Sequence, residues 1–318
     1  MKEKFAFIAF SESSSKINEE IYLSDELKIY PRMPFNIDDY WEKWLGAIKI
    51  SAIKNSNLVI YSSKITDNPD IIDQGHEYVK RRVLEFYYSL ALYGVPRYSE
   101  ANMIIGSINE ESVSIRGFSY LDYFHFVYNG NPKIINKMDI FEIYKIYKVL
   151  SQIYSESNIK QDKYFRIRYG LNAYFKAIKE KENYYRISQL VRAIEALIKP
   201  RIGKTKKDFA HRCKTFVIPN PDSEAILQEI YELRNKVEHI HPLTEVFPTM
   251  SRDVASEIID SHVRKLEEIA RNIYIKLFLN PDLLDRFLNN NSIDKFWSLS
   301  DQERDKLWGS KLDIKTIK

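Results

Sequence analysis

The segment "FVYNGNPKIINKMD", residues 126–139, divides the chain into two parts of different character. Its Asn-Gly-Asn-Pro core is a set of turn-forming residues that interrupts helices and strands. Before it, runs rich in Ile, Val, Tyr and Phe end at turn residues. After it, nearly every stretch has apolar residues at helical spacing. The sequence therefore predicts an α+β protein, with a small mixed α/β domain over residues 1–135 and an all-helical domain over residues 136–318.

The first part is expected to hold several strands and one long helix. The strand candidates are "KFAFIAF" (4–10), "EIYLSDELKIYP" (20–31), "NLVIYSSKI" (57–65) and "NMIIGSINEESVSIRGFSY" (102–120), the last as a hairpin. A helix is expected over residues 68–94, ending at Gly94. His76 and His125 are isolated and are expected to be structural. No glycine-rich phosphate loop and no catalytic constellation occurs here, so the sequence predicts no role for this domain.

The second part is expected to be helical throughout. The predicted helices are 139–157, 163–181, 184–200, 204–217, 222–239 and 251–280, followed by two or three short helices in the tail. Asp222 and Ser251 are candidate N-caps, and Pro200 and Pro242 follow two of the helix ends. Trp297 and Trp308 in the tail are expected to pack back on the larger helices.

Composition limits the class of protein. The net charge of +4 over 318 residues is too small to mark the whole chain as a nucleic-acid binder. The single cysteine, Cys213, excludes an intramolecular disulfide and multi-cysteine metal sites, and is expected to be a half-buried apolar residue. The apolar run near the N-terminus is too short for a secretory leader, and no stretch reaches the length of a transmembrane span. We expect a soluble, cytoplasmic protein with no membrane association.

The stretch "ELRNKVEHIHP", residues 232–242, holds the strongest candidate for chemistry. Asn235 and His239 are four residues apart and share one helix face, and Arg234 flanks the same edge. A histidine can exchange a proton near neutral pH, and an arginine can stabilise a phosphate that gains charge in a transition state. These groups suit cleavage of an RNA phosphodiester by 2′-hydroxyl attack, without a metal ion or a cofactor.

Several structural explanations of this stretch remain open. Arginine and histidine near a helix C-terminus favour the helix dipole without any catalytic purpose. Glu238 is four residues after Arg234 and could pair with it. His241 precedes a proline and is expected to mark the helix end, although it could add an RNA contact. A metal site is less attractive, because no carboxylate or cysteine cluster accompanies His239 and His241.

The segment from residue 199 to residue 214 is strongly basic. It holds seven lysines and arginines against one aspartate, a net charge of +6. Lys204, Lys206, Lys207 and Arg212 are candidates for contacts with an RNA backbone. The alternative is a solvated loop and helix face.

The stretch "ELRNKVEH" resembles the Arg-polar-x3-His form of the R-x4-6-H motif of HEPN domains. The upstream sequence, "RIRYGLNAYFKAIKEKENYYRISQLVRAIEALI" followed by "FAHRC", is similar to the helices that precede this motif in Apea-like HEPN proteins. The resemblance covers about residues 140–280. The motif is short, and the order of the helices around it gives most of the specificity.

The resemblance implies a HEPN-type helical bundle that forms a homodimer, with two motifs facing each other across one cleft. It implies a metal-independent endoribonuclease of a phage-defence or toxin–antitoxin system, with an antitoxin or a phage-derived trigger as a possible partner. By position, Arg234 would stabilise the phosphoryl charge, His239 would be the acid/base, and Asn235 would orient or bind. Glu195 and Arg212 are further candidates, for RNA contact or for a structural ion pair with the motif. The alternative is a catalytically silent HEPN module that binds RNA, a nucleotide or a protein.

Overall fold

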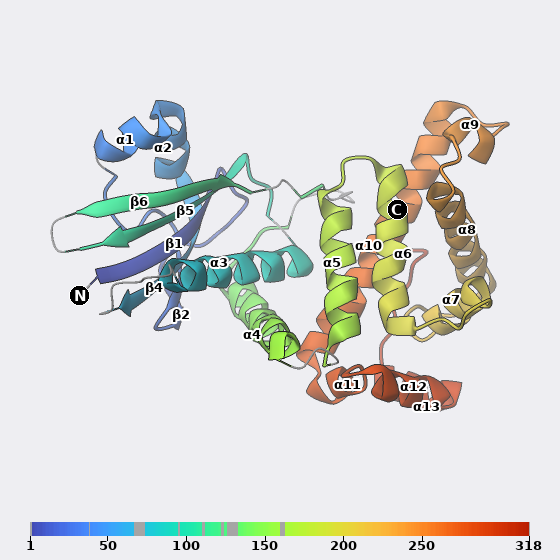
Figure 1. The fold of residues 1–318 in the computed structure, drawn as a ribbon. Coiled ribbons are helices and arrows are strands. Elements are labelled where there is room, and N and C mark those ends of the chain that lie inside the picture. The colour runs from blue at the N-terminus through green and yellow to red at the C-terminus, as the bar shows by residue number, and fades with distance from the viewer. Residues whose placement is uncertain are drawn as a thin grey trace. The chain divides into compact units, whose positions relative to one another are not determined.

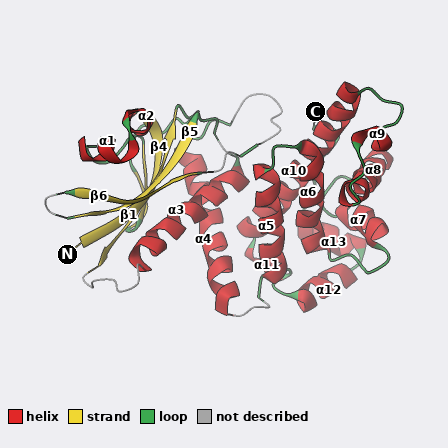
Figure 2. Cartoon of the chain, turned by 45° about the horizontal axis from the view of Figure 1, so that its top comes forward, coloured by secondary structure: helices red, strands yellow, loops and turns green. Residues whose placement is uncertain are grey.

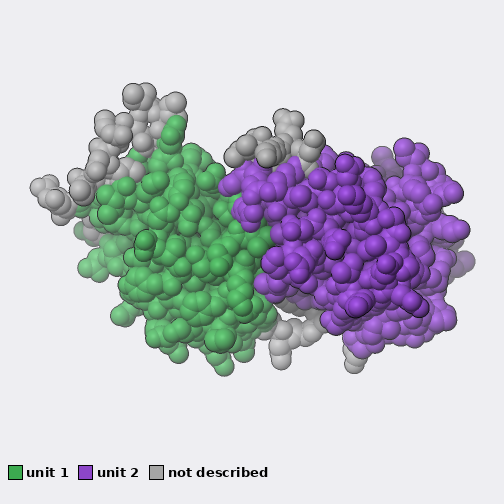
Figure 3. Space-filling model, turned by 90° about the horizontal axis from the view of Figure 1, so that it is seen from below, with its two compact units in different colours: residues 1–123, 131–151 green, residues 124–130, 152–318 purple. Residues whose placement is uncertain are grey.

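A computed structural model describes residues 2–37, 39–66, 74–94, 96–109, 112–121, 124–125, 133–159 and 163–317. The chain forms two compact units, residues 1–123 with 131–151 and residues 124–130 with 152–318 (Figure 3). Of the predicted break over residues 126–139, residues 126–132 lie outside the described residues. The division between the units falls within helix α4 (Lys137–Ile159), whereas the sequence placed the domain boundary at residue 135.

Unit 1 is built on one antiparallel sheet of six strands with the order β2-β3-β4-β1-β5-β6 (Figure 1). Its strands are β1 (Lys2–Ser11), β2 (Ile21–Ser24), β3 (Leu27–Tyr30), β4 (Ser56–Thr66), β5 (Glu100–Ile108) and β6 (Val113–Tyr120). All four predicted strand regions are present, and the hairpin over residues 102–120 is confirmed as β5–β6. The α+β class predicted from the sequence is therefore present.

The central strand β1 is apolar on both faces because helices cover both faces of the sheet. On one face, the ring centres of Phe7 and of Trp41 in α1 (Asp39–Leu45) are 6.3 Å apart, and α2 (Ala47–Lys54) packs on the same side. Phe10, on the other face, contacts Tyr87 of α3 (Gln74–Tyr93). The sequence predicted α3 but missed α1 and α2, which are short helices that pack against the sheet; α2 is also weakly amphipathic.

Unit 2 consists mostly of helices (Figure 2). After α4 these are α5 (Phe165–Lys179), α6 (Asn183–Ile198), α7 (Thr205–Cys213), α8 (Pro221–Glu238), α9 (Leu243–Val246), α10 (Arg252–Leu279), α11 (Pro281–Asp285), α12 (Asn290–Ser298) and α13 (Asp301–Trp308). Each predicted helix is present, and the short α9 was missed. Helices α5 and α6 approach closely at Gly170, where a Cβ atom would lie 2.8 Å from the Ala193 carbonyl oxygen.

Two helix ends differ from the prediction: α7 ends at Cys213 rather than at residue 217, and α8 has another N-cap. Ser251 caps α10 as predicted. The predicted cap Asp222 is wrong, because the Asn220 side chain accepts the Ser223 N–H at 2.9 Å and α8 begins at Pro221, a favoured first residue. Trp297 and Trp308 are buried, which confirms their packing.

The remaining structural predictions concern buried polar and sulfur groups. His76 is buried and its Nε2 lies 2.9 Å from the Ser107 hydroxyl, so it is structural, as predicted; His125 is half-buried. Cys213 is fully rather than half buried, and burial raises the pKa of its thiol. Among the described residues, no helix combines the length and apolar character needed to cross a bilayer.

Candidate functional site

The C-terminal end of α8 presents the Arg234–His239 motif, and a defined turn ends the helix there. The N–H of His239 donates to the Asn235 carbonyl oxygen at 3.1 Å, so these two residues lie one turn apart. Ile240 then adopts a left-handed conformation with φ of 60°, and the N–H of His241 donates to the Lys236 carbonyl oxygen at 3.1 Å. This pattern is a Schellman motif, in which glycine usually occupies the position of Ile240. The backbone after His239 is therefore fixed in a conformation that a β-branched residue seldom adopts.

Arg234 is held by neighbours on two helices. Its Nη1 donates to Asn235 Oδ1 at 3.1 Å, and its Nη2 lies 3.6 Å from Glu195 Oε2 on α6. The guanidinium stands 5.5 Å from the centre of the Tyr231 ring, and the Tyr231 hydroxyl donates to Glu195 Oε1 at 2.9 Å. Glu195 thus links two α8 side chains, which matches the ion pair that the sequence offered as one of its roles.

Glu238 does not form the ion pair with Arg234 that the sequence left open. It accepts hydrogen bonds from the Ser188 hydroxyl and, at 2.9 Å, from Arg192 Nη2, both on α6. Burial raises the pKa of the Glu238 carboxyl, but the hydrogen bond from Ser188 and the charges of Arg192 and Arg234 outweigh it and leave the pKa below its usual value. Glu238 therefore fastens the last turn of α8 to α6, next to His239.

The two histidines of the stretch are both exposed. The His241 Nδ1 lies 3.0 Å from Glu245 Oε2, and the His241 carbonyl oxygen accepts the Tyr184 hydroxyl at 2.7 Å. No hydrogen bond or ion pair of the His239 ring is found within the described part of the chain. His239 is thus open to a ligand or to another chain, whereas His241 has a structural partner.

The basic segment is less open than its composition suggested. Four of its seven cations pair with carboxylates: Lys199 with Asp294, Arg201 with Asp208, Lys206 with Glu232 and Lys214 with Glu224. Lys204 and Lys207 are exposed, and no acidic partner of either occurs among the described residues. Among the residues of this segment predicted to contact RNA, Lys204 and Lys207 are therefore the lysines whose charge is not offset by a described carboxylate.

Arg212 serves the C-terminal end of α6. The last carbonyl groups of a helix have no partner within it, and here side chains from other elements supply the donors. Arg212 Nη1 donates to the carbonyl oxygens of Ile198 and Lys199 at 2.5 and 2.7 Å. Trp297 Nε1 donates to that of Leu197 at 3.1 Å. The structure therefore gives Arg212 a capping role that the sequence did not indicate.

Sequence reasoning missed three groups that shape this site. Tyr231 lies three residues before Arg234, and helical spacing could have identified it. Ser188 and Arg192 lie on α6, about one turn apart, and they meet α8 only because the two helices pack together. Within the described ranges, no cluster of three His, Cys, Asp or Glu side chains is placed to hold a metal ion.

Comparison with known proteins found no family model, no curated protein and no solved structure that matches the chain.

Proposed function

We propose that unit 2 is a HEPN-type domain and a metal-independent endoribonuclease that acts in a phage-defence or toxin–antitoxin system. One observation carries the proposal. The motif lies at an exposed helix end, with Arg234 anchored through Asn235 and Glu195 and with the His239 ring unengaged by the described residues. A fixed cation and a free imidazole at one helix end are the groups that metal-free phosphodiester cleavage needs.

The reaction would follow from these positions. The ribose 2′-oxygen attacks the adjacent phosphorus as a base removes its proton, the new 2′-O–P bond forms, and the P–O5′ bond breaks. An acid returns a proton to the leaving 5′-oxygen, so the products are a 2′,3′-cyclic phosphate and a 5′-hydroxyl. Arg234 would stabilise the charge on the phosphoryl oxygens, and Asn235 would hold the guanidinium in place.

Two proton transfers call for two acid/base groups, and the motif offers one imidazole that no described residue engages, that of His239. A homodimer with two facing motifs would supply the second from the other copy. The exposure of His239 supports this arrangement, because its own chain leaves the ring uncovered.

The test is RNA cleavage by purified full-length protein with and without EDTA. Arg234→Ala and His239→Ala are each expected to abolish cleavage, and EDTA is expected to have no effect. His211→Ala, which removes another exposed histidine, is the matched control and is expected to leave cleavage unchanged. Full activity of either motif variant would refute the proposal.

A catalytically silent module that binds RNA is the second candidate. The observation in its favour is the Glu195–Arg234 ion pair, because it offsets the positive charge that Arg234 would need to stabilise a phosphoryl transition state. Salt-sensitive RNA binding without cleavage over long incubation would support this alternative.

A further inference from the structure

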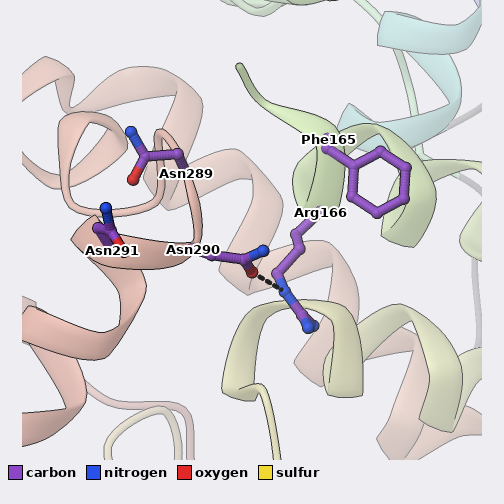
Figure 4. A pocket seen from close by; sticks show the side chains of 5 residues that line it. All are labelled: Phe165, Arg166, Asn289, Asn290 and Asn291. Atoms are coloured by element: carbon purple, nitrogen blue, oxygen red, sulfur yellow. Dashed lines mark hydrogen bonds between the residues drawn. The ribbon is translucent and has the colours of Figure 1, made fainter. Parts of the chain in front are cut away.

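A pocket of about 280 Å³ lies in unit 2, where the start of α5 meets the start of α12. It is lined by Phe165, Arg166, Asn289, Asn290 and Asn291 (Figure 4). None of these residues belongs to the motif on α8. The pocket brings together an aromatic ring, a guanidinium and three consecutive amides, and these groups are suited to bind a nucleotide.

The guanidinium of Arg166 is fixed on two sides and open on a third. Its Nε donates to Asn290 Oδ1 at 2.6 Å, and its Nη1 donates to the Ala196 carbonyl oxygen at 3.3 Å. No partner of Nη2 is found among the described residues. A guanidinium anchored in this way is ready to bind a phosphate oxygen without losing further side-chain freedom.

The asparagines have amide groups to spare. Asn289 uses Oδ1 to accept the Ser292 N–H at 3.0 Å, and Asn290 uses Oδ1 for Arg166. No hydrogen bond of the Asn291 side chain is found within the described residues. Because an asparagine amide both donates and accepts, it can bind the edge of an unpaired base.

The aromatic component extends beyond the pocket. Phe165 and Tyr169 lie one turn apart on α5, and their rings stack with centres 6.2 Å apart and planes at 27°. Their residues are 48% and 53% exposed, so the rings do not serve the core. Figure 4 shows the Phe165 ring and the asparagine side chains on opposite sides of Arg166. Stacking faces and polar amides thus flank one cation.

We propose that this surface binds a single-stranded RNA segment, with a base stacked on Phe165 and Tyr169, a phosphate on Arg166 and a neighbouring nucleotide at the asparagines. Aromatic stacking beside a cationic backbone contact is the usual means of binding unpaired strands. The choice of RNA rests on the proposed function. The geometry also relates the two sites, because Ala196, which holds Arg166, directly follows Glu195, which holds Arg234. Along α6, Ser188, which donates to Glu238, lies about 12 Å from Ala196 at 1.5 Å per residue.

The experiment measures binding separately from cleavage. The protein carries His239→Ala, and the probe is a fluorescein-labelled single-stranded 12-mer RNA of mixed sequence, followed by anisotropy. The double variant Phe165→Ala/Tyr169→Ala is expected to bind about tenfold or more weakly, given the usual contribution of a stacked base. Tyr185→Ala on α6, which removes another tyrosine that is 55% exposed, is the matched control and is expected to bind normally.

Further variants separate loss of stacking from loss of structure. Phe165→Trp keeps a stacking face and is expected to bind at least as tightly as the parent. Asn291→Ala, at an exposed position, is expected to weaken binding several-fold. A duplex of the same sequence is expected to bind more weakly than the single strand, because its bases cannot reach the rings.

Two outcomes would overturn the inference: unchanged RNA binding by the double variant, or equal weakening by Tyr185→Ala. If binding were unchanged and the double variant also lost self-association, the aromatic pair would be identified as a protein interface. Failure of the proposed function is a separate result. If the protein that retains His239 never cleaves RNA, but the double variant loses binding, the inference stands and the nuclease proposal falls.

Discussion

Replacing Glu195 with glutamine tests how the structure holds Arg234. The substitution removes the negative charge 3.6 Å from Arg234 Nη2 but keeps an oxygen that can accept the Tyr231 hydroxyl, now at 2.9 Å. Shape and volume are nearly unchanged. Any effect therefore reports the charge of Glu195 rather than its packing.

Two opposite effects are expected. At 3.6 Å the attraction between the charges is about 5 kcal/mol with an effective dielectric constant near 20. Desolvation and solvent screening cancel most of it, because the side chains are still 21% and 16% exposed. We expect the free energy of unfolding to fall by about 1 kcal/mol. RNA affinity should rise a few-fold, because Arg234 then meets a phosphate with its charge no longer offset.

The assays are urea unfolding and RNA binding at several salt concentrations, both in the His239→Ala background. If one further phosphate contact forms, the slope of log affinity against log salt should steepen by about 0.7 for a single strand. Glu232→Gln is the control, since it frees Lys206 in an exposed ion pair and should change stability by less than about 1 kcal/mol.

The reasoning would be refuted if Glu195→Gln weakened RNA binding, or if it left both stability and affinity unchanged. Loss of cleavage with unaltered affinity, measured in the protein that retains His239, would instead make Glu195 a participant in proton transfer. The three results are distinct because stability, binding and cleavage are read separately.

Three further predictions concern the stability of the chain, each measured by urea unfolding. Gly170→Ala should lower the free energy of unfolding by about 1–3 kcal/mol or more, because the added Cβ has no room where α5 approaches α6. The control Gly117→Ala, at a position with space for a Cβ, should have a small effect. Equal effects of the two substitutions would contradict this. Ile240→Gly should raise stability by up to about 1 kcal/mol, because glycine adopts the left-handed conformation without strain, and a loss would show that the turn is not formed as described. The hydrogen bond from Arg201 holds the pKa of the Asp208 carboxyl far below its usual value, so the stability that this carboxylate contributes is complete above about pH 4 and is lost as the pH falls further. Asp208→Asn should therefore be less stable at neutral pH, and its free energy of unfolding should fall less on acidification. An acid profile unchanged by the substitution would exclude Asp208 as a source of acid sensitivity.

The sequence was sufficient where local pattern determines structure. The β1 stretch is apolar at every position from Phe5 to Phe10, and a strand buried on both faces follows from that alone. The long helices follow from apolar spacing, and α8 ends where a proline comes three residues after His239. By contrast, α1 is only seven residues long and α2 carries little amphipathic signal, and Trp41 of α1 packs on the sheet that it covers.

The candidate site was predictable along one helix and not between helices. Spacing placed Arg234, Asn235 and His239 together, and it also suggested Glu238 as a partner of Arg234. The actual partner is Glu195, because α6 packs against α8 and brings that carboxylate closer. Which of two acids pairs with an arginine depends on helix packing, and a single sequence does not reveal it. The HEPN assignment and the RNA contacts stay predictions.

Helix α6 gives these observations a common physical basis. Two of its side chains anchor the motif end of α8: Glu195 pairs with Arg234, and Arg192 pairs with Glu238. Its last carbonyl groups accept hydrogen bonds from side chains of α5, α7 and α12. A helix end satisfied by Arg166, Trp297 and Arg212 is rigid, so the residues that it positions have little freedom to move. Substitutions that loosen this end should therefore disturb both the pocket at α12 and the motif on α8. Substitutions at exposed His239 should affect chemistry alone, and this difference separates structural from catalytic loss of function in unit 2.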